Sequence, residues 1–233
     1  MRKRIRMIIE EPTFRIDAEE TDQFKDKIYK KIANAARTCY QSGSMANERN
    51  DAKLIHNLIQ HQHEAMLEHA SITVTFKVDR GITHELVRHR LASFAQESSR
   101  YCNYNKEKFG NAITYIDIRN AVEIDPATKK MDTKAKMYLI NEWIKACSDA
   151  EKHYMRMLEL GCSPQIARSV LNNSTKSEIV VTANIREWRH ILKLRAVGTT
   201  GAPHPQMVEI MQPLLKKFKS MLPDLFFDLN IPE

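Results

Sequence analysis

The 233-residue sequence lacks any long apolar run. No stretch approaches the roughly 18 consecutive apolar residues that a transmembrane helix requires, so we expect no interaction with a membrane. The N-terminus, MRKRIRMIIEEPTFRID, changes from basic to apolar, but Glu10 and Glu11 interrupt its short apolar part. That pattern is not typical of a signal peptide, and we interpret the segment as the first strand of a sheet.

Cysteine is scarce, and its spacing excludes the common metal and disulfide patterns. Cys39, Cys102, Cys147 and Cys162 form no CxxC pair. Such scattered residues favour reduced thiols in a cytoplasmic protein over a disulfide framework or a structural zinc site. The sequence also has no internal repeat and no low-complexity linker.

The composition is that of an ordinary globular protein, with 42% hydrophobic and 28% charged residues. We therefore expect one large domain over residues 1–233. A net charge of +7 favours polyanions or phosphorylated small molecules as partners, or indicates no partner in particular. No RRM, KH or zinc-finger signature is present, so we expect no nucleic acid, and a basic nucleic-acid-binding protein is the less favoured alternative.

Hydrophobic periodicity predicts the secondary structure. We expect helices at residues 22–40, 47–62, 133–159, 186–195 and 205–221, a helix start at SPQ, 163–165, and a helix from about residue 82 into the following RHR stretch. Strands are expected at residues 71–79, 113–118 and 178–184. In the long helix 133–159 the residues expected to be buried are Met137, Leu139, Ile140, Trp143, Ile144 and Met155. The fold class predicted is α+β, a helix-rich single domain around a small, mainly antiparallel sheet.

The stretch RHRLASFAQESSRY, from Arg88 to Tyr101, gathers three arginines, a histidine and several hydroxyl groups. A guanidinium group is planar and matches the geometry of a phosphate. In a continuous helix Arg88 and Arg90 would point about 200° apart. Either the helix ends nearby, or the two arginines reach different groups of a large ligand.

Two further segments carry polar side chains. HQHEAMLEH contains His61, His63 and His69, but their spacing fits none of the common zinc motifs, so we predict no metal site. In ANIREWRHILKLR, Asn184 opens a helix, and free backbone N–H groups at such an end attract anions.

Together these segments resemble the flavin-dependent thymidylate synthases. The family's RHR element, followed after seven residues by serine, is matched by Arg88-His89-Arg90 and Ser98. Its HExxxEH segment corresponds to residues 63–69, its AR element to Ala167-Arg168, and an upstream AAR to residues 35–37. Its N-x-R and L-R elements correspond to Asn184-Ile185-Arg186 and Leu194-Arg195.

The resemblance implies reductive methylation of dUMP to dTMP, with methylenetetrahydrofolate as carbon donor and NADPH-reduced FAD as hydride source. It also implies a homotetramer with active sites shared between subunits. The implied FAD contacts are His63, Ala65, Glu68, Arg88, His89, Arg90, Gln96, Asn184, Ile185, Arg186 and His190. The implied dUMP contacts are Glu85, Arg88, Gln96, Glu97, Ser98, Ser99, Arg100, Arg168 and Arg195.

In family terms Arg195 is the catalytic residue, because it holds the uracil ring and favours its ionised form, which activates carbon 5. The resemblance also implies direct hydride transfer from reduced flavin to uracil, with no enzyme nucleophile, so a structural role is expected for Cys102. The chain departs from the family where Glu85 replaces a common Gln, Ala95-Gln96 an Asn-Glu pair, and Ala65 a Thr. A related enzyme that transfers a hydroxymethyl group to a pyrimidine nucleotide is the alternative on the same fold.

Overall fold

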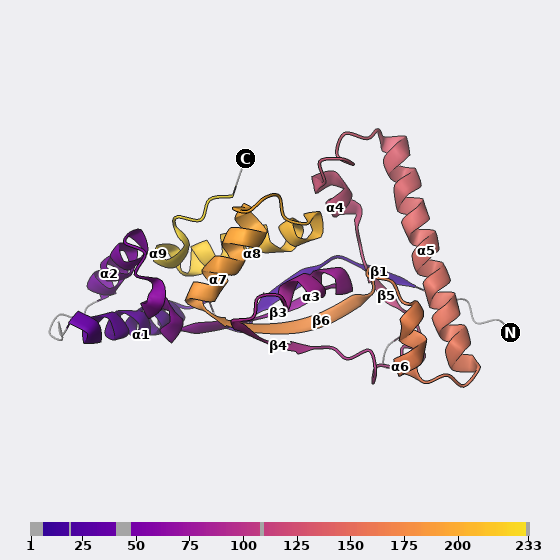
Figure 1. Cartoon of the computed structure of the whole chain (residues 1–233), viewed down its shortest axis with the longest axis horizontal. Helices are drawn as coiled ribbons and strands as arrows, with labels where there is room; N and C mark the ends of the chain where they lie inside the picture. The colour runs from indigo at the N-terminus through magenta and orange to yellow at the C-terminus, as the bar shows by residue number, and fades with distance from the viewer. Residues whose placement is uncertain (1–6, 19, 41–47, 108–109, 232–233) are drawn as a thin grey trace. The chain divides into compact units, whose positions relative to one another are not determined.

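The computed structural model describes residues 7–18, 20–40, 48–107 and 110–231. The longer helices are α1 (Asp22–Tyr40), α2 (Glu48–Gln60), α3 (Arg80–Leu86), α5 (Thr133–Glu159), α7 (Ile185–Leu192) and α8 (Pro205–Met221) (Figure 1). The shorter helical elements are η1 (Glu64–His69), α4 (Arg119–Ile124), α6 (Pro164–Ala167), η3 (Arg168–Val170), η4 (Lys193–Val197) and α9 (Pro223–Phe226). The strands are β1 (Ile8–Glu10), β2 (Thr13–Ile16), β3 (Ser71–Asp79), β4 (Ala92–Gln96), β5 (Thr114–Ile116) and β6 (Lys176–Asn184). The predicted α+β class is confirmed.

The strands form two sheets. Four of them have the order β2-β3-β6-β4, and the long strands β3 and β6 are neighbours (Figure 1). The N–H of Arg80 donates to Thr175 O, and the N–H of Ile185 donates to Ala70 O. The end of β3 therefore meets the start of β6 and the reverse, so this central pair is antiparallel, as predicted. Strands β1 and β5 form a separate parallel pair with Ile8 opposite Thr114.

Two compact units make up the chain, each built from three separate segments. Unit 1 contains Met1–Thr13, Phe76–Arg88 and Ala95–Ile179. Unit 2 contains Phe14–Thr75, His89–Phe94 and Val180–Glu233. The expectation of a single domain over residues 1–233 stays a prediction.

Unit 1 has a core around α5. Helix α5 begins where the Asp132 carboxylate accepts a bond from the N–H of Ala135 at 2.7 Å, an N-cap arrangement. The buried Tyr115 hydroxyl donates to the carbonyl of Cys147 at 2.8 Å and so joins β5 to α5. The buried cluster around this contact comprises Tyr104, Ile113, Tyr115, Cys147, Tyr154 and Ala167.

Unit 2 has a core around α7 and α8. Trp188 of α7 is fully buried, and its ring packs edge-on against Phe218 of α8 with centroids 5.5 Å apart. The indole N–H donates to Ile72 O at 2.9 Å, which holds α7 on strand β3. Arg37 of α1 forms a buried ion pair with Asp51 of α2. Burial therefore orders the segment on which Asn184, Arg186 and His190 stand.

Most predicted elements are confirmed, but the region around RHR differs. Helix α3 ends at Leu86, so the helix predicted to run into RHR is wrong there, and the first of the two alternatives for Arg88 and Arg90 holds. Strand β4 follows instead, because this segment pairs with β6. Directly after β4, the N–H of Glu97 donates to the carbonyl of Glu178 in β6, which lies 81 residues away in the chain. Local periodicity contains no information about such a partner.

Three smaller differences remain. Helix α4 was not predicted, and Met137, expected to be buried, is 61% exposed. The predicted start of the second helix, residue 47, and residues 1–6 of the expected first strand lie outside the described residues. In the part of the chain that the structure describes, no helix combines the length and apolar composition of a transmembrane span.

Candidate functional site

A polar pocket of about 370 Å³ lies in unit 1. Its wall is made by the start of α3, the segment after β4, the α6–η3 region and the start of β6. The lining residues are Arg80, Glu97, Ser99, Tyr104, Gln165, Arg168, Ser169, Leu171, Thr175, Lys176 and Ser177. Three of the residues predicted to bind dUMP, Glu97, Ser99 and Arg168, are therefore brought together.

Positive charge exceeds negative charge in this pocket, since Arg80, Arg168 and Lys176 line it beside one carboxylate, Glu97. The Lys176 ammonium lies 2.8 Å from Glu97 Oε2. The Tyr104 hydroxyl donates to Glu97 Oε1 at 3.3 Å, and burial, followed by the charge of Glu97, raises the pKa of Tyr104. The tyrosine stays protonated at neutral pH and acts as a donor. The pocket suits an anion of charge about −2, such as a phosphate monoester.

Three predicted residues in unit 1, Arg168, Ser99 and Gln96, form hydrogen bonds with other protein groups. Arg168 Nη1 donates to the hydroxyl of the buried Ser99 at 3.1 Å, which orients the guanidinium group. The Gln96 amide donates to the hydroxyls of Thr83 at 2.9 Å and Ser177 at 3.0 Å. Gln96 therefore joins α3, β4 and β6.

Other predicted residues lie at the surface of the chain. Arg88, Arg90 and Arg100 are exposed, whereas Glu85 and Ser98 are partly buried. The Arg100 guanidinium carbon lies 5.5 Å from the centroid of the Tyr101 ring, a distance at which a cation interacts with a π face. The exposed arginines are accessible to an anionic ligand or to another chain.

A second polar cluster lies in unit 2, around His89. Its side chain is only 5% exposed, and its Nε2 accepts a bond from Arg195 Nε–H at 3.2 Å. Burial, reinforced by the charges of Arg195 and His190, lowers the pKa of His89 from 6.5 to about 4. His89 is therefore neutral at pH 7, and because Nε2 accepts, the ring proton is on Nδ1.

Arg195 stands on an unusual piece of backbone. The helix of α7 continues into η4, a π-helical turn, and ends at Gly198 with φ of 79°. A Cβ at Gly198 would lie 3.0 Å from Gly201 O, so glycine is required there. π-Helical turns are frequent at functional sites because they change the direction of a side chain relative to the preceding helix.

The predicted FAD contacts of unit 2 gather around the start of α7. The Asn184 side chain accepts the N–H of Glu187 at 2.8 Å, which confirms the predicted cap. Arg186 Nη1 lies 2.6 Å from Glu68 Oε1, so these two predicted residues are also brought together. His63, Ala65, Glu68, Arg186 and His190 are exposed, whereas the side chain of Ile185 is fully buried.

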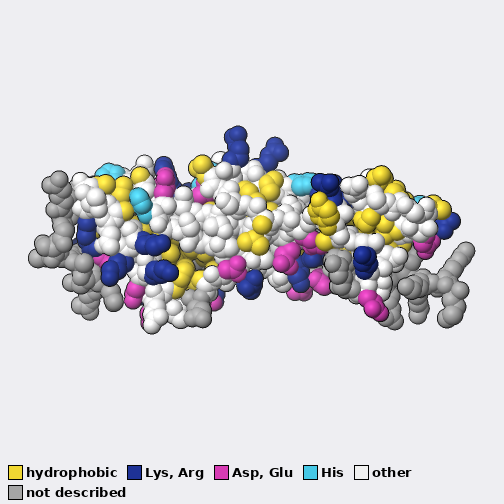
Figure 2. All heavy atoms as spheres, turned by 90° about the horizontal axis from the view of Figure 1, so that it is seen from below, with side chains coloured by type: hydrophobic (Ala, Val, Ile, Leu, Met, Phe, Trp, Pro, Cys, Tyr) yellow, Lys and Arg dark blue, Asp and Glu magenta, His cyan; other side chains and the backbone are white. Residues whose placement is uncertain are grey.

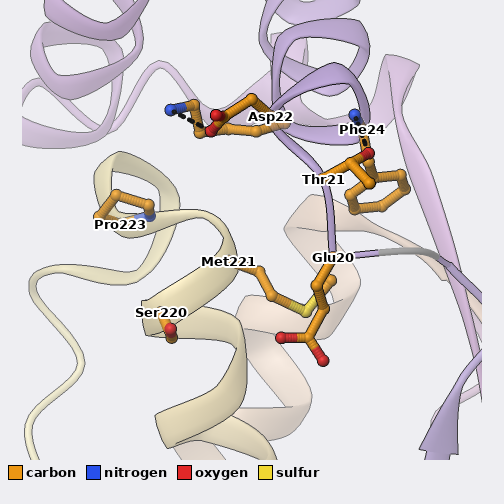
Figure 3. Close-up of a pocket in the computed structure, with 8 residues that line it drawn as sticks. Glu20, Thr21, Asp22, Phe24, Ser220, Met221 and Pro223 are labelled. Carbon is orange, nitrogen blue, oxygen red and sulfur yellow. Dashed lines mark hydrogen bonds and ion pairs between the residues drawn. The ribbon is translucent and has the colours of Figure 1, made fainter.

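Two further pockets contain none of the predicted site residues. One of about 280 Å³ in unit 2 is lined by Glu20, Asp22, Lys25 and neighbours, with the Glu20 carboxylate directed toward Met221 (Figure 3). Another, in unit 1, lies along α4 and α5 and includes Ile140. The first has two carboxylates beside one lysine, and the second has two cations beside one carboxylate, whereas the Arg168 pocket has three cations beside one carboxylate.

Among the described residues, no group of three or more His, Cys, Asp or Glu is placed to hold a metal ion. On the face seen in Figure 2, the coloured Lys and Arg side chains are interspersed with Asp and Glu. A nucleic-acid surface typically concentrates its basic side chains.

Sequence reasoning missed Arg80, Tyr104 and Lys176 in the unit 1 pocket and Glu187 beside His89. Lys176 begins a strand, and nothing in its neighbours marks it as a ligand-facing residue. Glu187 had a usable signal, because an acid three positions before His190 on a helix lies on the same face.

Comparisons with known proteins identify the family. A family model described as Thymidylate synthase complementing protein matches residues 23–224. The chain belongs to this family. A flavin-dependent thymidylate synthase from Mycobacteroides abscessus is 35% identical over 208 residues, which cover 84% of this chain and 78% of the relative. One from Corynebacterium efficiens is 31% identical over 204 residues with the same coverage.

A solved structure supports the fold of this flavin-dependent thymidylate synthase family member. The UMP/dUMP methylase PolB from Streptomyces cacaoi, bound with 5-Br dUMP, aligns with a TM-score of 0.75 and covers 94% of this chain. The alignment covers 95% of PolB, and the identity is 23%. The predicted family, the methyltransferase class and a flavin cofactor are thus confirmed.

Proposed function

We propose that this chain converts dUMP to dTMP, with methylenetetrahydrofolate as carbon donor and NADPH-reduced FAD as hydride source. The observation that carries the proposal is the unit 1 pocket, in which Glu97, Ser99 and Arg168 lie together beside two further cations. These residues belong to the set that the family motifs assign to dUMP. A nucleotide monophosphate supplies the dianion that the pocket suits.

In this proposal Arg168 and Lys176 hold the phosphate of dUMP. Ser99 keeps the Arg168 guanidinium in one orientation, and Glu97 does the same for the Lys176 ammonium. Because both cations are already oriented, little side-chain entropy is lost when the ligand binds. Ser98 and the exposed Arg100 would complete the contacts from the neighbouring segment.

Arg195 acts on the uracil ring. Its guanidinium group would stabilise negative charge that develops on the ring and so raise the electron density at carbon 5. Such a group contributes most when its orientation is set before the reaction begins. The bond from Arg195 Nε–H to the neutral His89 provides this orientation.

The donor set around α7 fits a flavin dinucleotide. Arg186 is 51% exposed and Lys193 36% exposed, and both contact the Glu64 carboxylate, so two partly exposed cations lie close enough to share one pyrophosphate. His63 and His190 add exposed imidazole groups for hydrogen bonding. When bound, the reduced flavin supplies the hydride. Arg88, His89 and Arg90 belong to the same proposed contact set, and Ile185 would contribute only its backbone.

A homotetramer in the cytoplasm completes the proposal. The exposure of Arg88, Arg90, Arg100 and His190 in one chain is expected if a partner subunit covers them and shares the active site. The free cysteines are compatible with a reducing compartment. Sedimentation of the purified protein would test the assembly.

The experiment is a coupled test of colour and product. We expect flavin absorbance after purification or after reconstitution with FAD, and NADPH oxidation stimulated by dUMP. Addition of methylenetetrahydrofolate should yield dTMP, identified by mass spectrometry. UMP is tested beside dUMP, because a structural neighbour is described as a UMP/dUMP methylase.

A folded sample that takes up no flavin would contradict the proposal. A hydroxymethylated nucleotide in place of dTMP would support the related enzyme on the same fold. DNA binding that falls steeply with salt, without any bound chromophore, would support the nucleic-acid alternative.

A further inference from the structure

Glu187 is a buried acid that none of the predicted contacts includes. It lies on α7 and is 4% exposed. Its Oε1 is 3.7 Å from Nδ1 of His89, and both side chains are 5% exposed. A carboxylate is expensive to bury unless a donor or a cation faces it, so its position beside an imidazole needs a reason.

The hydrogen bond from Arg195 determines which ring nitrogen of His89 carries the proton. Arg195 Nε–H donates to Nε2 of His89, so Nε2 carries no proton. The proton is then on Nδ1, the nitrogen directed at the Glu187 carboxylate. The opposite tautomer would place two N–H donors, from Arg195 and Nε2, against each other and leave Nδ1 as an acceptor opposite a carboxylate oxygen.

The Glu187 carboxylate neither caps helix α7 nor pairs with the neighbouring Arg189, because other groups fill both roles. The helix start is capped by Asn184, which uses the backbone N–H of Glu187 and not its carboxylate. The buried Arg189, two residues further on, bonds to Glu64, Asp228 and the carbonyl of Leu225. The acid beside His89 is therefore not the partner of that arginine.

One further ionisable ring faces the same histidine. His190 packs edge-on against His89 with centroids 6.0 Å apart. Burial raises the pKa of the Glu187 carboxyl, and the electrostatic interaction with His190 acts in the opposite direction. At 3.7 Å the contact between Glu187 Oε1 and Nδ1–H is electrostatic, since the carboxyl oxygen attracts the positive end of the N–H group.

We infer that Glu187 is a positioning residue for dUMP methylation: its carboxylate holds His89 in the Nδ1–H tautomer, and His89 thereby directs its Nε2 lone pair at Arg195. Glu187 contacts His89, and His89 contacts Arg195. Of these three residues only Arg195 would touch the substrate. The inference rests on the proposed function for the role of Arg195, whereas the tautomer of His89 does not depend on it.

The first test is the tautomer itself. Protein labelled with ¹⁵N in its histidines is examined by NMR at pH 7, and His89 is assigned by the signal lost in His89→Gln. We expect the Nδ1–H form in the wild type and in Glu187→Gln, whose amide oxygen can still accept. In Glu187→Ala we expect a mixture of tautomers.

The second test separates binding from chemistry. Removal of the outer partner of a metal-bound histidine typically costs about 10- to 100-fold in activity, and by analogy we expect kcat for dTMP formation to fall by a similar factor in Glu187→Ala. The KM for dUMP and the bound flavin should change less than about threefold, because the substrate contacts remain. Glu187→Gln should recover most of kcat. Glu178→Ala, an exposed acid on β6, is the matched control and should behave as the wild type.

Each result has a defined meaning. Absence of dTMP formation by the wild type would refute the proposed function, whereas the NMR result would still decide the inference. A wild-type His89 that carries its proton on Nε2 would overturn the inference, as would unchanged kcat and tautomer in a folded Glu187→Ala. If Glu187→Ala does not fold, the wild-type spectrum and Glu187→Gln decide.

Discussion

The unit 1 pocket and the His89 cluster of unit 2 differ in how far their charged and polar groups are exposed to solvent. In the pocket, three cations and one carboxylate line an open volume, and Lys176 and Glu97 remain 22% and 16% exposed. In the cluster, His89 and Glu187 are each 5% exposed and lie against other protein groups. The pocket has accessible positive charge that can bind a ligand, whereas the polar groups of the cluster contact one another.

The difference corresponds to two tasks. A phosphate dianion needs accessible charge, and interactions near the surface are moderated by solvent. An arginine that must stabilise charge during a reaction needs a fixed orientation, and its neighbours must be buried to hold it. Substitutions in the pocket should therefore affect mainly KM, and substitutions in the cluster mainly kcat.

The largest effect is expected for Arg195→Ala, which removes the group proposed to stabilise the uracil anion. Loss of one preorganised donor typically lowers kcat by about 10²- to 10³-fold. Flavin should remain bound, because its proposed contacts are elsewhere, and stopped-flow absorbance would show this. A variant with lower dUMP affinity but wild-type kcat would place Arg195 with the pocket and break the comparison.

Lys176→Met should raise the KM for dUMP by about tenfold or more, since a charge-assisted hydrogen bond contributes about 1.5–3 kcal/mol. kcat should stay near the wild-type value. The matched control is Lys77→Met, which breaks a Lys–Glu ion pair, Lys77–Glu10, that is 38% and 39% exposed and does not line the pocket. Deoxyuridine, which lacks the phosphate, should bind Lys176→Met as well as it binds the wild type. Equal losses for both ligands would count against a phosphate contact.

The buried His89 should make stability depend on pH. Its pKa is about 4 in the folded chain and about 6.5 when unfolded, so the unfolded state takes up the proton first as pH falls. The stability contribution is present above pH 6.5 and is lost between about pH 6.5 and 4. Urea unfolding should show a loss on the order of 2 kcal/mol from pH 7 to pH 5 that is missing in His89→Gln. His153→Gln, on an exposed residue of α5, should retain the wild-type dependence.

The smallest effect is expected for Cys102→Ala. Cys102 is partly buried against the core of unit 1 and lines neither region. Since no enzyme nucleophile is proposed, dTMP synthesis should remain within about tenfold of the wild type, in line with a small change of packing. A variant that binds flavin and dUMP yet makes no dTMP, together with a trapped thiol–uracil adduct in the wild type, would overturn this mechanism.

The long helices and strands could be predicted from the sequence more reliably than the short ones. Helix 22–40 and strand 71–79 have the predicted bounds, because long amphipathic periods of 3.6 and 2 are set by burial of one face. Strand β4 and helix α4 have only 5 and 6 residues, too few to show a period. The end of α3 before RHR likewise depends on the pairing of the following strand with β6.

The sequence by itself determined the family, because motifs such as Arg88-His89-Arg90 and Asn184-Ile185-Arg186 are contiguous patterns of side-chain chemistry. Only the tertiary structure decided which of them meet. Ser99 and Arg168 are 69 residues apart in the chain, and His89 and Arg195 are 106 apart. It also brought Lys176 into the pocket and Glu187 beside His89. The physical reason is that local periodicity encodes which face of an element is buried, whereas the partner of a buried polar group depends on the packing of distant segments.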